Sequence, residues 1–368
     1  MFLRNVLLTT INEVEIALSN GTPGLFYFHQ VAVSMLGDFR MSKHTRKLAV
    51  ERMGHHQTAL EQCKKRFGEE HPSTADSYDE LGFSQHEVGD VTSALCSKHR
   101  ALDIRRKLFE EDHLSTADSY HKLGIIQNRL GDFSSAIQSH QRSLDIRLNL
   151  FGEDHPKTAD SYHELAHNYH ELGVFRYSVG VFSSALQCAQ RALDIRRKLF
   201  GEDHSSTADS YHSLSVTQHH LGDLSSALQS EQRALDIRRK LFGENYSGTA
   251  DSYYELGITQ RELSEFRSAL QSHQRALDIR LKFLGEDHSS TADSYHELGI
   301  AQHWLGDFKS ALQSYQRALD IRLKLFGKDH SRTPDSYYLL GITQRLLGDF
   351  TYALESCLLF VGEEHSSN

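Results

Sequence analysis

The sequence is short of four things that would each point to a particular class of protein. Only 4 of the 368 residues are proline, so long stretches are free to be helical. No uninterrupted apolar run is long enough for a membrane span, and we expect no membrane partner. Charged and amide side chains break up the N-terminal segment, so a secretory signal is not expected either.

Basic charge and paired cysteines are also scarce. The net charge is −9 and the isoelectric point is near 6.2, whereas nucleic-acid-binding proteins normally carry a basic surface. We therefore expect no nucleic-acid partner. The four cysteines are far apart and form no metal-ligand or disulfide pattern. They are Cys63, Cys96, Cys188 and Cys357. Such cysteines are typical of reduced thiols in a cytoplasmic protein.

What the sequence does contain is a repeat. The segment F-G-E-D-H-x-x-T-A-D-S-Y recurs along the chain, mostly at intervals of 42 residues, as from His71 to His113. One interval, from His155 to His204, is lengthened to 49 residues, and Tyr246 replaces the histidine in one copy. A repeat of this length indicates that one structural unit is reused many times.

Each repeat has the pattern of two helices, as residues 116–151 show. Thr116 is expected to be the N-cap of the first helix, and Gly131-Asp132 separates it from the second. The second helix is expected to end at Gly152. The small residues Gly124 and Ala136 are expected to face each other across the hairpin. Because one hairpin cannot bury its apolar stripe alone, neighbouring hairpins must stack.

The pattern resembles the tetratricopeptide repeat, in the 42-residue form of kinesin light chains and nephrocystin-3-like proteins. The matching motifs are Leu298-Gly299, the L-G-D-F turn at 305–308, the S-A-L at 310–312 and the A-L-D-I-R run at 318–322. The resemblance implies an all-α fold, a right-handed superhelical solenoid of antiparallel helix pairs.

The resemblance extends well over only part of the chain. Residues 67–368 are expected to form about seven repeats, the last one truncated, after a degenerate helix pair at 25–66 and an N-terminal segment at 1–24 that could act as a cap. In the third repeat G-V-F occurs twice, at 173–175 and 180–182. This seven-residue insertion is expected to form a bulge in the turn, or alternatively a hinge. The apolar C-terminal end, residues 357–361, is expected to pack against a partner or a second copy, unless the chain is a fragment of a larger protein.

Histidine is abundant and invites chemical hypotheses. His163-Glu164 and His167 match the H-E-x-x-H signature of zinc proteases, but a sister repeat carries the same His-Glu-Leu at 296–298. Incidental metal binding by His163, His167 and His170 stays open. The 24 histidines also raise the hypothesis that low pH loosens the array. The arginine-rich A-L-D-I-R-R-K segments are expected to be a solvated outer face.

No phosphate-binding loop, nucleophile motif or metal-ligand cluster is present, so we expect no enzyme, no catalytic residue and no cofactor. By resemblance, the first helices line a concave groove that binds extended peptide segments of other proteins. The groove residues predicted from helical spacing are His121, Asn128, His163, His170, His212, His219, Tyr254, Arg261, His296, His303, Trp304, Tyr338 and Arg345.

Two functions are compatible with these features. The first is a non-catalytic, cytoplasmic scaffold or adaptor for protein–protein interaction. The second is the sensor or regulatory arm of a larger signalling protein of the NTPase-switch type.

Overall fold

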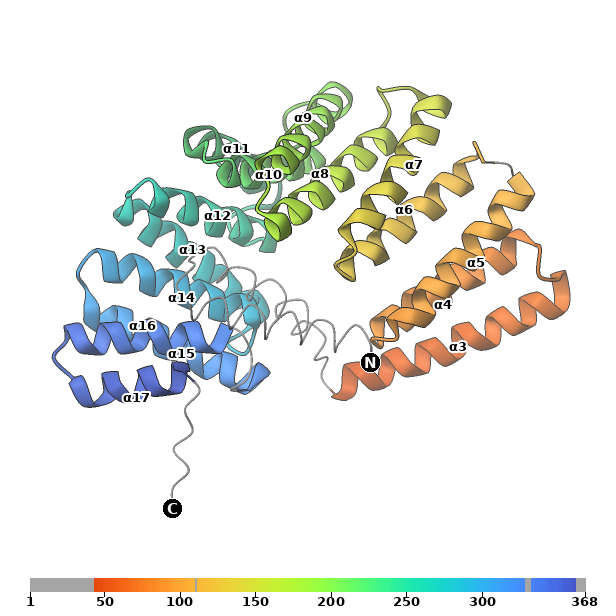
Figure 1. The fold of residues 1–368 in the computed structure, drawn as a ribbon. Coiled ribbons are helices and arrows are strands. Elements are labelled where there is room, and N and C mark those ends of the chain that lie inside the picture. Colours follow the sequence, from red (N-terminus) through yellow and green to blue (C-terminus); the bar gives the residue numbers. More distant parts are fainter. Residues whose placement is uncertain (1–42, 110, 328–331, 362–368) are drawn as a thin grey trace, which may run out of the picture. The chain divides into compact units, whose positions relative to one another are not determined.

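The computed structural model describes residues 43–109, 111–327 and 332–361, and within these ranges every regular element is a helix (Figure 1). The helices are α3 (Lys43–Phe67), α4 (Pro72–Glu87), α5 (Val91–Phe109), α6 (Leu114–Arg129), α7 (Phe133–Phe151), α8 (Pro156–Arg176), α9 (Val179–Phe200), α10 (Ser205–His220), α11 (Leu224–Phe242), α12 (Ser247–Glu262), α13 (Phe266–Leu284), α14 (Ser289–Trp304), α15 (Phe308–Phe326), α16 (Arg332–Leu346) and α17 (Phe350–Val361). None of them is long and apolar enough to cross a bilayer.

The helices form two compact bodies, one within Asp38–Gly201 and one within Glu202–Asn368. In each body the two helices of a hairpin pack against each other, and the second helix packs against the first helix of the next hairpin. The predicted all-α array of antiparallel helix pairs is therefore confirmed. The predicted segment 1–24 and the first part of 25–66 lie outside the described residues, as do the side chains of 357–361.

The seven-residue insertion does not form a bulge in the turn. Instead it lengthens both helices of its hairpin, because α8 has 21 residues and α9 has 22, whereas the neighbouring α6 and α7 have 16 and 19. Both helices are extended at the turn, so the spacing of their apolar stripes is unchanged. The turn itself uses Tyr177 in the left-handed conformation, where most sister hairpins have Gly-Asp.

The recurrent histidine, and not the threonine three residues later, caps the first helix. His113 has extended backbone angles and its Nδ1 accepts from the amide of Ser115 at 3.1 Å. The expectation that Thr116 is the N-cap is therefore wrong. The ring of His155 stacks on Phe151 with centroids 4.1 Å apart, so the histidine also fixes the preceding loop against the end of the previous helix.

The threonine hydroxyl has another partner, the carbonyl of the glycine that ends the previous helix. Thr158 donates to the Gly152 carbonyl at 2.9 Å, and Thr291 donates to Gly285 at the same distance. Gly152 has a φ of 77°, a conformation that strongly favours glycine. Glycine, histidine and threonine together fix the path of the chain from one hairpin to the next.

The first arginine of each A-L-D-I-R run is buried, which corrects the expectation of a solvated outer face for that residue. Arg280 is 7% exposed and lies 4.5 Å above the ring of Tyr254. Its guanidinium donates to Asp251 of its own hairpin at 3.0 Å and to Ser294 of the next hairpin at 2.8 Å. One side chain therefore links three helices, α12, α13 and α14. Arg105, Arg147, Arg238 and Arg322 make the equivalent contacts.

The glycine in the first helix faces a large side chain of the second helix. The nearest side chain to Gly124 is the imidazole of His140, and a Cβ at this glycine would lie 2.4 Å from Nε2. Ala136, the expected neighbour, is fully buried. The glycine is therefore required to make room for the His140 ring. Other hairpins have a different side chain at the position of His140.

The single copy with tyrosine in place of the capping histidine provides a test of the cap. Tyr246 still stacks on Phe242 at 4.4 Å but makes no side-chain hydrogen bond to the helix amides. We predict that Tyr246→His adds this bond and stabilises the first turn of α12 by about 1 kcal/mol, the usual effect of an N-cap side chain. Slower hydrogen exchange of the Gly248 amide would support this, and Tyr246→Phe should leave the exchange unchanged.

The bridging arginine provides a second test. We predict that Arg280→Met lowers the free energy of unfolding by about 2 kcal/mol, because Ser294 and the Ser290 carbonyl lose a charged donor. Urea denaturation measures the change. Arg275→Met, an exposed position on the same helix, should change stability by less than about 0.5 kcal/mol. Equal losses in both variants would contradict the bridging role.

Candidate protein-binding surfaces

The predicted groove residues lie on the first helices of the hairpins, but they differ widely in exposure. Trp304 is 63% exposed, Tyr338 is 46% exposed, and Arg345 is exposed as well. His170 is buried, with its ring edge-on to Phe182 at 5.6 Å. The others are half-buried, namely His121, Asn128, His163, His212, His219, Tyr254, Arg261, His296 and His303. The three exposed residues all belong to the last two hairpins.

Several of the half-buried residues bind the first helix of the next hairpin. Asn128 donates to Asn168, and His219 lies 2.9 Å from Glu262. Arg261 lies 3.4 Å from Glu297. His303 and the Thr343 hydroxyl are 3.3 Å apart. These side chains hold neighbouring first helices together, so part of their polar surface is already used within the array.

A second set of side chains, which sequence reasoning did not select, lies behind this surface. Each member occupies the same position of its second helix, opposite the glycine or serine of the first helix in the same hairpin. The residues are Lys98, His140, Glu231, His273 and Tyr315, all 5% exposed or less. The signal that could have found them is variation, because this position changes its chemical class from one hairpin to the next while most neighbouring positions are copies.

In two hairpins this buried residue forms an ion pair with a residue of the first helix. Glu231 accepts from His212 at 3.0 Å. Burial opposes the charge on His212, but the Glu231 carboxylate outweighs it and raises the pKa of His212 to about 9. Lys98 pairs with Asp79 at 3.4 Å, and Arg105 reaches the same carboxylate at 2.8 Å. These hairpins have charged interiors at neutral pH.

In three other hairpins the pair consists of two rings. His121 and His140 have ring centroids 5.2 Å apart, Tyr254 and His273 5.8 Å, and His296 and Tyr315 6.0 Å. Neither nitrogen of His140 or of His273 has a hydrogen-bond partner. Burial lowers the pKa of each of these two imidazoles to about 3, and the pKa of His121 to about 4. All three rings are therefore neutral at pH 7.

The first helices of the second body also carry an aliphatic row and two half-buried carboxylates. Val216, Ile258, Ile300 and Ile342 follow the Tyr/His position by four residues and are half-buried. They share a helix face with it. Burial raises the pKa of Glu255 to about 7 and also raises the pKa of Glu297. The first helices α10, α12, α14 and α16 thus present an aromatic or imidazole group, an aliphatic group and then a basic or imidazole group, in that order.

The H-E-x-x-H residues do not converge on a metal position. His163 is half-buried, His167 has half of its side chain exposed, and His170 is buried. Among the residues that the structure describes, no three His, Cys, Asp or Glu side chains are placed to hold one ion. The motif is the ordinary repeat sequence with one substituted position.

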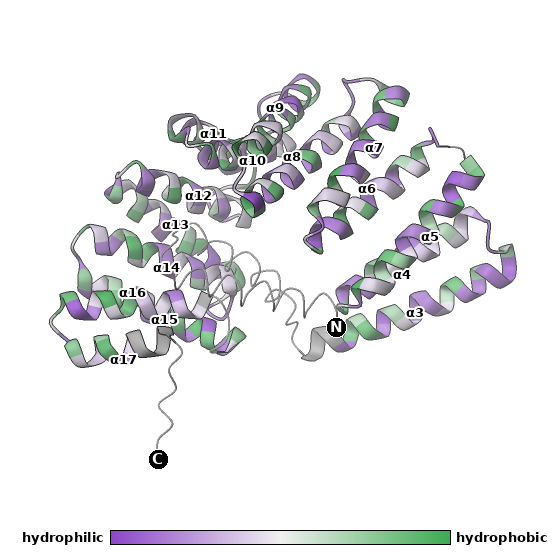
Figure 2. Cartoon of the chain, in the orientation of Figure 1, coloured by the Kyte–Doolittle hydropathy of each residue, from purple (hydrophilic) through white to green (hydrophobic). Residues whose placement is uncertain are grey.

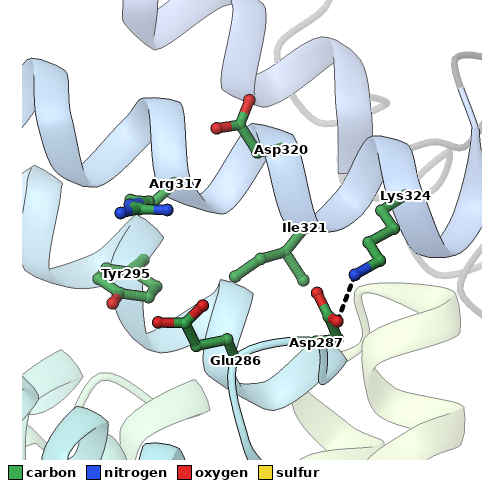
Figure 3. A pocket seen from close by; sticks show the side chains of 7 residues that line it. All are labelled: Glu286, Asp287, Tyr295, Arg317, Asp320, Ile321 and Lys324. Carbon is green, nitrogen blue, oxygen red and sulfur yellow. Dashed lines mark hydrogen bonds and ion pairs between the residues drawn. The ribbon is translucent and has the colours of Figure 1, made fainter.

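The second-helix side carries small polar crevices. One crevice of about 100 Å³ lies beside α15 and is lined by charged side chains together with Tyr295 and Ile321 (Figure 3). Lys324 pairs there with Asp287 of the loop before α14. Lys107, Lys198 and Lys240 make equivalent pairs with Glu70, Asp154 and Asp203. The lysines of these crevices are therefore engaged in holding the loops.

Comparison with known families agrees with this geometry. The pattern described as tetratricopeptide repeat matches residues 87–149, 168–240, 232–282, 269–324 and 290–356, together more than half of the chain. The chain belongs to the tetratricopeptide repeat family. Among curated proteins, no match was found.

Several solved structures share the tetratricopeptide repeat fold at low sequence identity. BtubC (BKLC) of P. vanneervenii has a TM-score of 0.55 and 23% identity, over 64% of this chain and 92% of that protein. A kinesin-light-chain-type protein of P. anserina with nearly identical repeats has a TM-score of 0.50 and 22% identity, over 58% and 97%. The signal-transduction ATPase PH0952 of Pyrococcus horikoshii, which has a tetratricopeptide repeat sensor, has a TM-score of 0.61 and 14% identity, over 97% and 52%.

The ring pairs of this tetratricopeptide array lead to a pH prediction. Because the pKa of His140 is about 3 in the folded chain and near 6.5 when unfolded, its neutral form stabilises the fold fully above pH 6.5. That stability is lost, by about 1.4 kcal/mol per pH unit, as the pH falls from 6.5 toward 3. We predict that His140→Tyr, which creates the His–Tyr pair of α14–α15, removes this part of the acid sensitivity. Urea denaturation at pH 6.5 and 4.5 measures it.

The reciprocal variant is the control. Tyr315→His converts the pair of α14–α15 into the pair of α6–α7, so it should add the same acid sensitivity to the second body. If neither substitution changes the difference in stability between pH 6.5 and 4.5, the buried imidazoles are not its source.

Proposed function

We propose that this tetratricopeptide repeat protein is a non-catalytic scaffold that binds extended segments of partner proteins along its first helices. The observation that carries the proposal is the order of side chains on α10, α12, α14 and α16. Four successive helices repeat an aromatic or imidazole group, an aliphatic group and a basic or imidazole group. An extended peptide also repeats its side chains at regular spacing, so it can contact the same set in each hairpin.

Tyr338 and Arg345 are the best candidates for direct contacts. Both are exposed on α16, seven residues apart and so on one helix face. Tyrosine and arginine are enriched among residues that dominate binding energy. The buried arginines and ring pairs beneath keep this surface in place, which reduces the entropy lost on binding. We expect the function in the cytoplasm, since Cys63, Cys96 and Cys188 are free thiols.

A second candidate function is the sensor arm of a larger signalling protein. The support is the similarity to PH0952, which covers 97% of this chain and about half of that ATPase. The two candidate functions predict different masses for the native polypeptide. A native protein whose mass exceeds that of this chain by the size of an NTPase domain would favour the sensor arm.

We predict that Tyr338→Ala with Arg345→Ala abolishes capture of partner proteins that the wild-type chain retains from a lysate. The change shortens two exposed side chains, so circular dichroism should stay unchanged. The matched control is Arg275→Ala with Arg317→Ala, two exposed arginines on second helices, which should capture the same proteins as wild type. Loss of capture by the control alone would move the site to the second-helix side.

A further inference from the structure

Glu255 of α12 is a carboxylate without a partner. It directly follows Tyr254, and it forms no hydrogen bond and no ion pair with any residue that the structure describes. Glu255 is half-buried, and its unpaired oxygens still touch solvent. A carboxylate that has lost part of its water and gained no partner destabilises the folded chain. A ligand that supplies the missing contact would remove this cost.

The same repeat position is linked to the preceding hairpin in two sister helices. In α6 it is Lys122, whose ammonium lies 2.8 Å from the carboxylate of Asp79. In α14 it is Glu297, whose carboxylate lies 3.4 Å from the guanidinium of Arg261. The position is therefore one at which a charged side chain normally receives a partner of opposite charge, and Glu255 is an exception.

The side chain that could pair with Glu255 is engaged elsewhere. By the 42-residue repeat, the residue of α10 that is equivalent to Arg261 is His219. His219 lies 2.9 Å from Glu262 instead. Burial lowers the pKa of His219, so the ring is neutral at pH 7 and leaves the charge of Glu262 uncancelled. His219 therefore provides a cation to neither carboxylate.

Four charged groups act on Glu255 from the helices around it. The cations are His212 of α10 and Arg280 of α13, and the anions are Glu231 of α11 and Glu297 of α14. Both cations already have a carboxylate partner, because His212 lies 3.0 Å from Glu231 and Arg280 lies 3.0 Å from Asp251. Burial, with the two neighbouring carboxylates, raises the pKa of Glu255 to about 7.

The first helices around Glu255 carry an excess of negative charge. Helices α10, α12 and α14 contain six carboxylates and one arginine, namely Asp209, Asp251, Glu255, Glu262, Asp293, Glu297 and Arg261. Buried arginines of the second helices bind the three aspartates, and Arg261 pairs with Glu297. The His212 and Glu231 charges cancel each other. Glu255 and Glu262 remain without a cation, so this surface favours a cationic group over an anionic one.

A lysine or arginine side chain of an extended segment fits this position. Hydrophilic and hydrophobic residues follow one another along α12 and α14 (Figure 2). Ile258 lies three residues after Glu255, on the neighbouring part of the same helix face, and is half-buried. Lysine and arginine can lay their aliphatic stems along such apolar surface while the charged end reaches a carboxylate.

We propose that Glu255 binds a lysine or arginine side chain of the partner segment that lies along the first helices. The inference rests on the proposed function and adds the charge that the segment carries at one position. The incoming cation gives Glu255 the kind of partner that Glu297 has in Arg261, and it holds the carboxylate ionised. Below pH 7 the site must lose a proton before it binds, so the affinity is expected to fall with pH.

Selection of random twelve-residue peptides on the full chain tests the proposal. The peptides that the wild-type chain retains should share a lysine or arginine at one position. In fluorescence anisotropy, replacing this residue by N-acetyllysine or citrulline should weaken binding at least tenfold. Glu255→Gln should weaken the unmodified peptide to the same extent, and on this variant the replacement should have no further effect. Retention of acidic or uncharged peptides would overturn the proposal, as would basic peptides that bind Glu255→Gln as tightly as wild type.

The pH dependence separates the Glu255 contact from a general attraction between charges. Binding to the wild-type chain should be at least fivefold weaker at pH 6 than at pH 8, and Glu255→Gln should remove most of this difference. The matched control is Asp278→Asn, which removes the same charge from an exposed position of α13 and should bind as wild type. An equal loss of affinity in the control would contradict the assignment to Glu255.

A sister residue separates binding from folding. Glu255→Ser takes the residue that α10 has at this position, Ser213, so it should keep the circular dichroism of the wild type and lose the peptide as Glu255→Gln does. If peptides are lost on Tyr338→Ala with Arg345→Ala but not on Glu255→Gln, the scaffold function stands and this inference is wrong. If the wild-type chain retains no peptide at all, both proposals fail.

Discussion

The contact on which the array depends is the buried guanidinium between hairpins. Each such guanidinium donates to an aspartate of its own hairpin and to a serine of the next hairpin, and so contacts three helices. The arginines are Arg147, Arg238, Arg280 and Arg322. A planar group with five donors can satisfy several acceptors at fixed angles, which a lysine cannot. Apolar packing between helices is tolerant of sliding. The arginine therefore adds the directional contact that fixes how one hairpin follows another within each body.

Behind the copied surface, five of the described hairpins have a buried pair of their own. The pairs are Asp79 with Lys98, His121 with His140, His212 with Glu231, Tyr254 with His273 and His296 with Tyr315. A wrong combination would leave a buried charge or imidazole unpartnered, at a cost well above that of an exposed substitution. These pairs also give two histidines at equivalent repeat positions opposite charge states at neutral pH. Glu231 keeps His212 charged, whereas burial keeps His121 neutral.

Some elements of the structure could be predicted from the sequence because they depend on local chain geometry. The helix pairs, the Gly131-Asp132 turn and the glycine at the end of α7 were predicted correctly from helical spacing and glycine positions. The N-cap was not, since Thr116 and His113 are both polar and lie near the helix start. Only the placement of the ring on Phe109 and of Nδ1 near the Ser115 amide distinguishes them. The predicted groove residues lie on the first helices of the hairpins. Their exposure could not be predicted, because it depends on contacts such as Arg261 with Glu297 that cross from one hairpin to the next.

By itself, the sequence determined the repeat, the helix pairs and the family, because periodicity and turn residues act within about forty residues of chain. Tertiary structure decided which polar groups are charged, buried or open to a partner. The same A-L-D-I-R arginine would be solvated on an isolated helix, and it becomes a buried bridge only when the next hairpin supplies a serine. In the sequence alone, Trp304 and Leu346 are not distinguished from other apolar residues. Packing leaves both of them exposed at the ends of their helices.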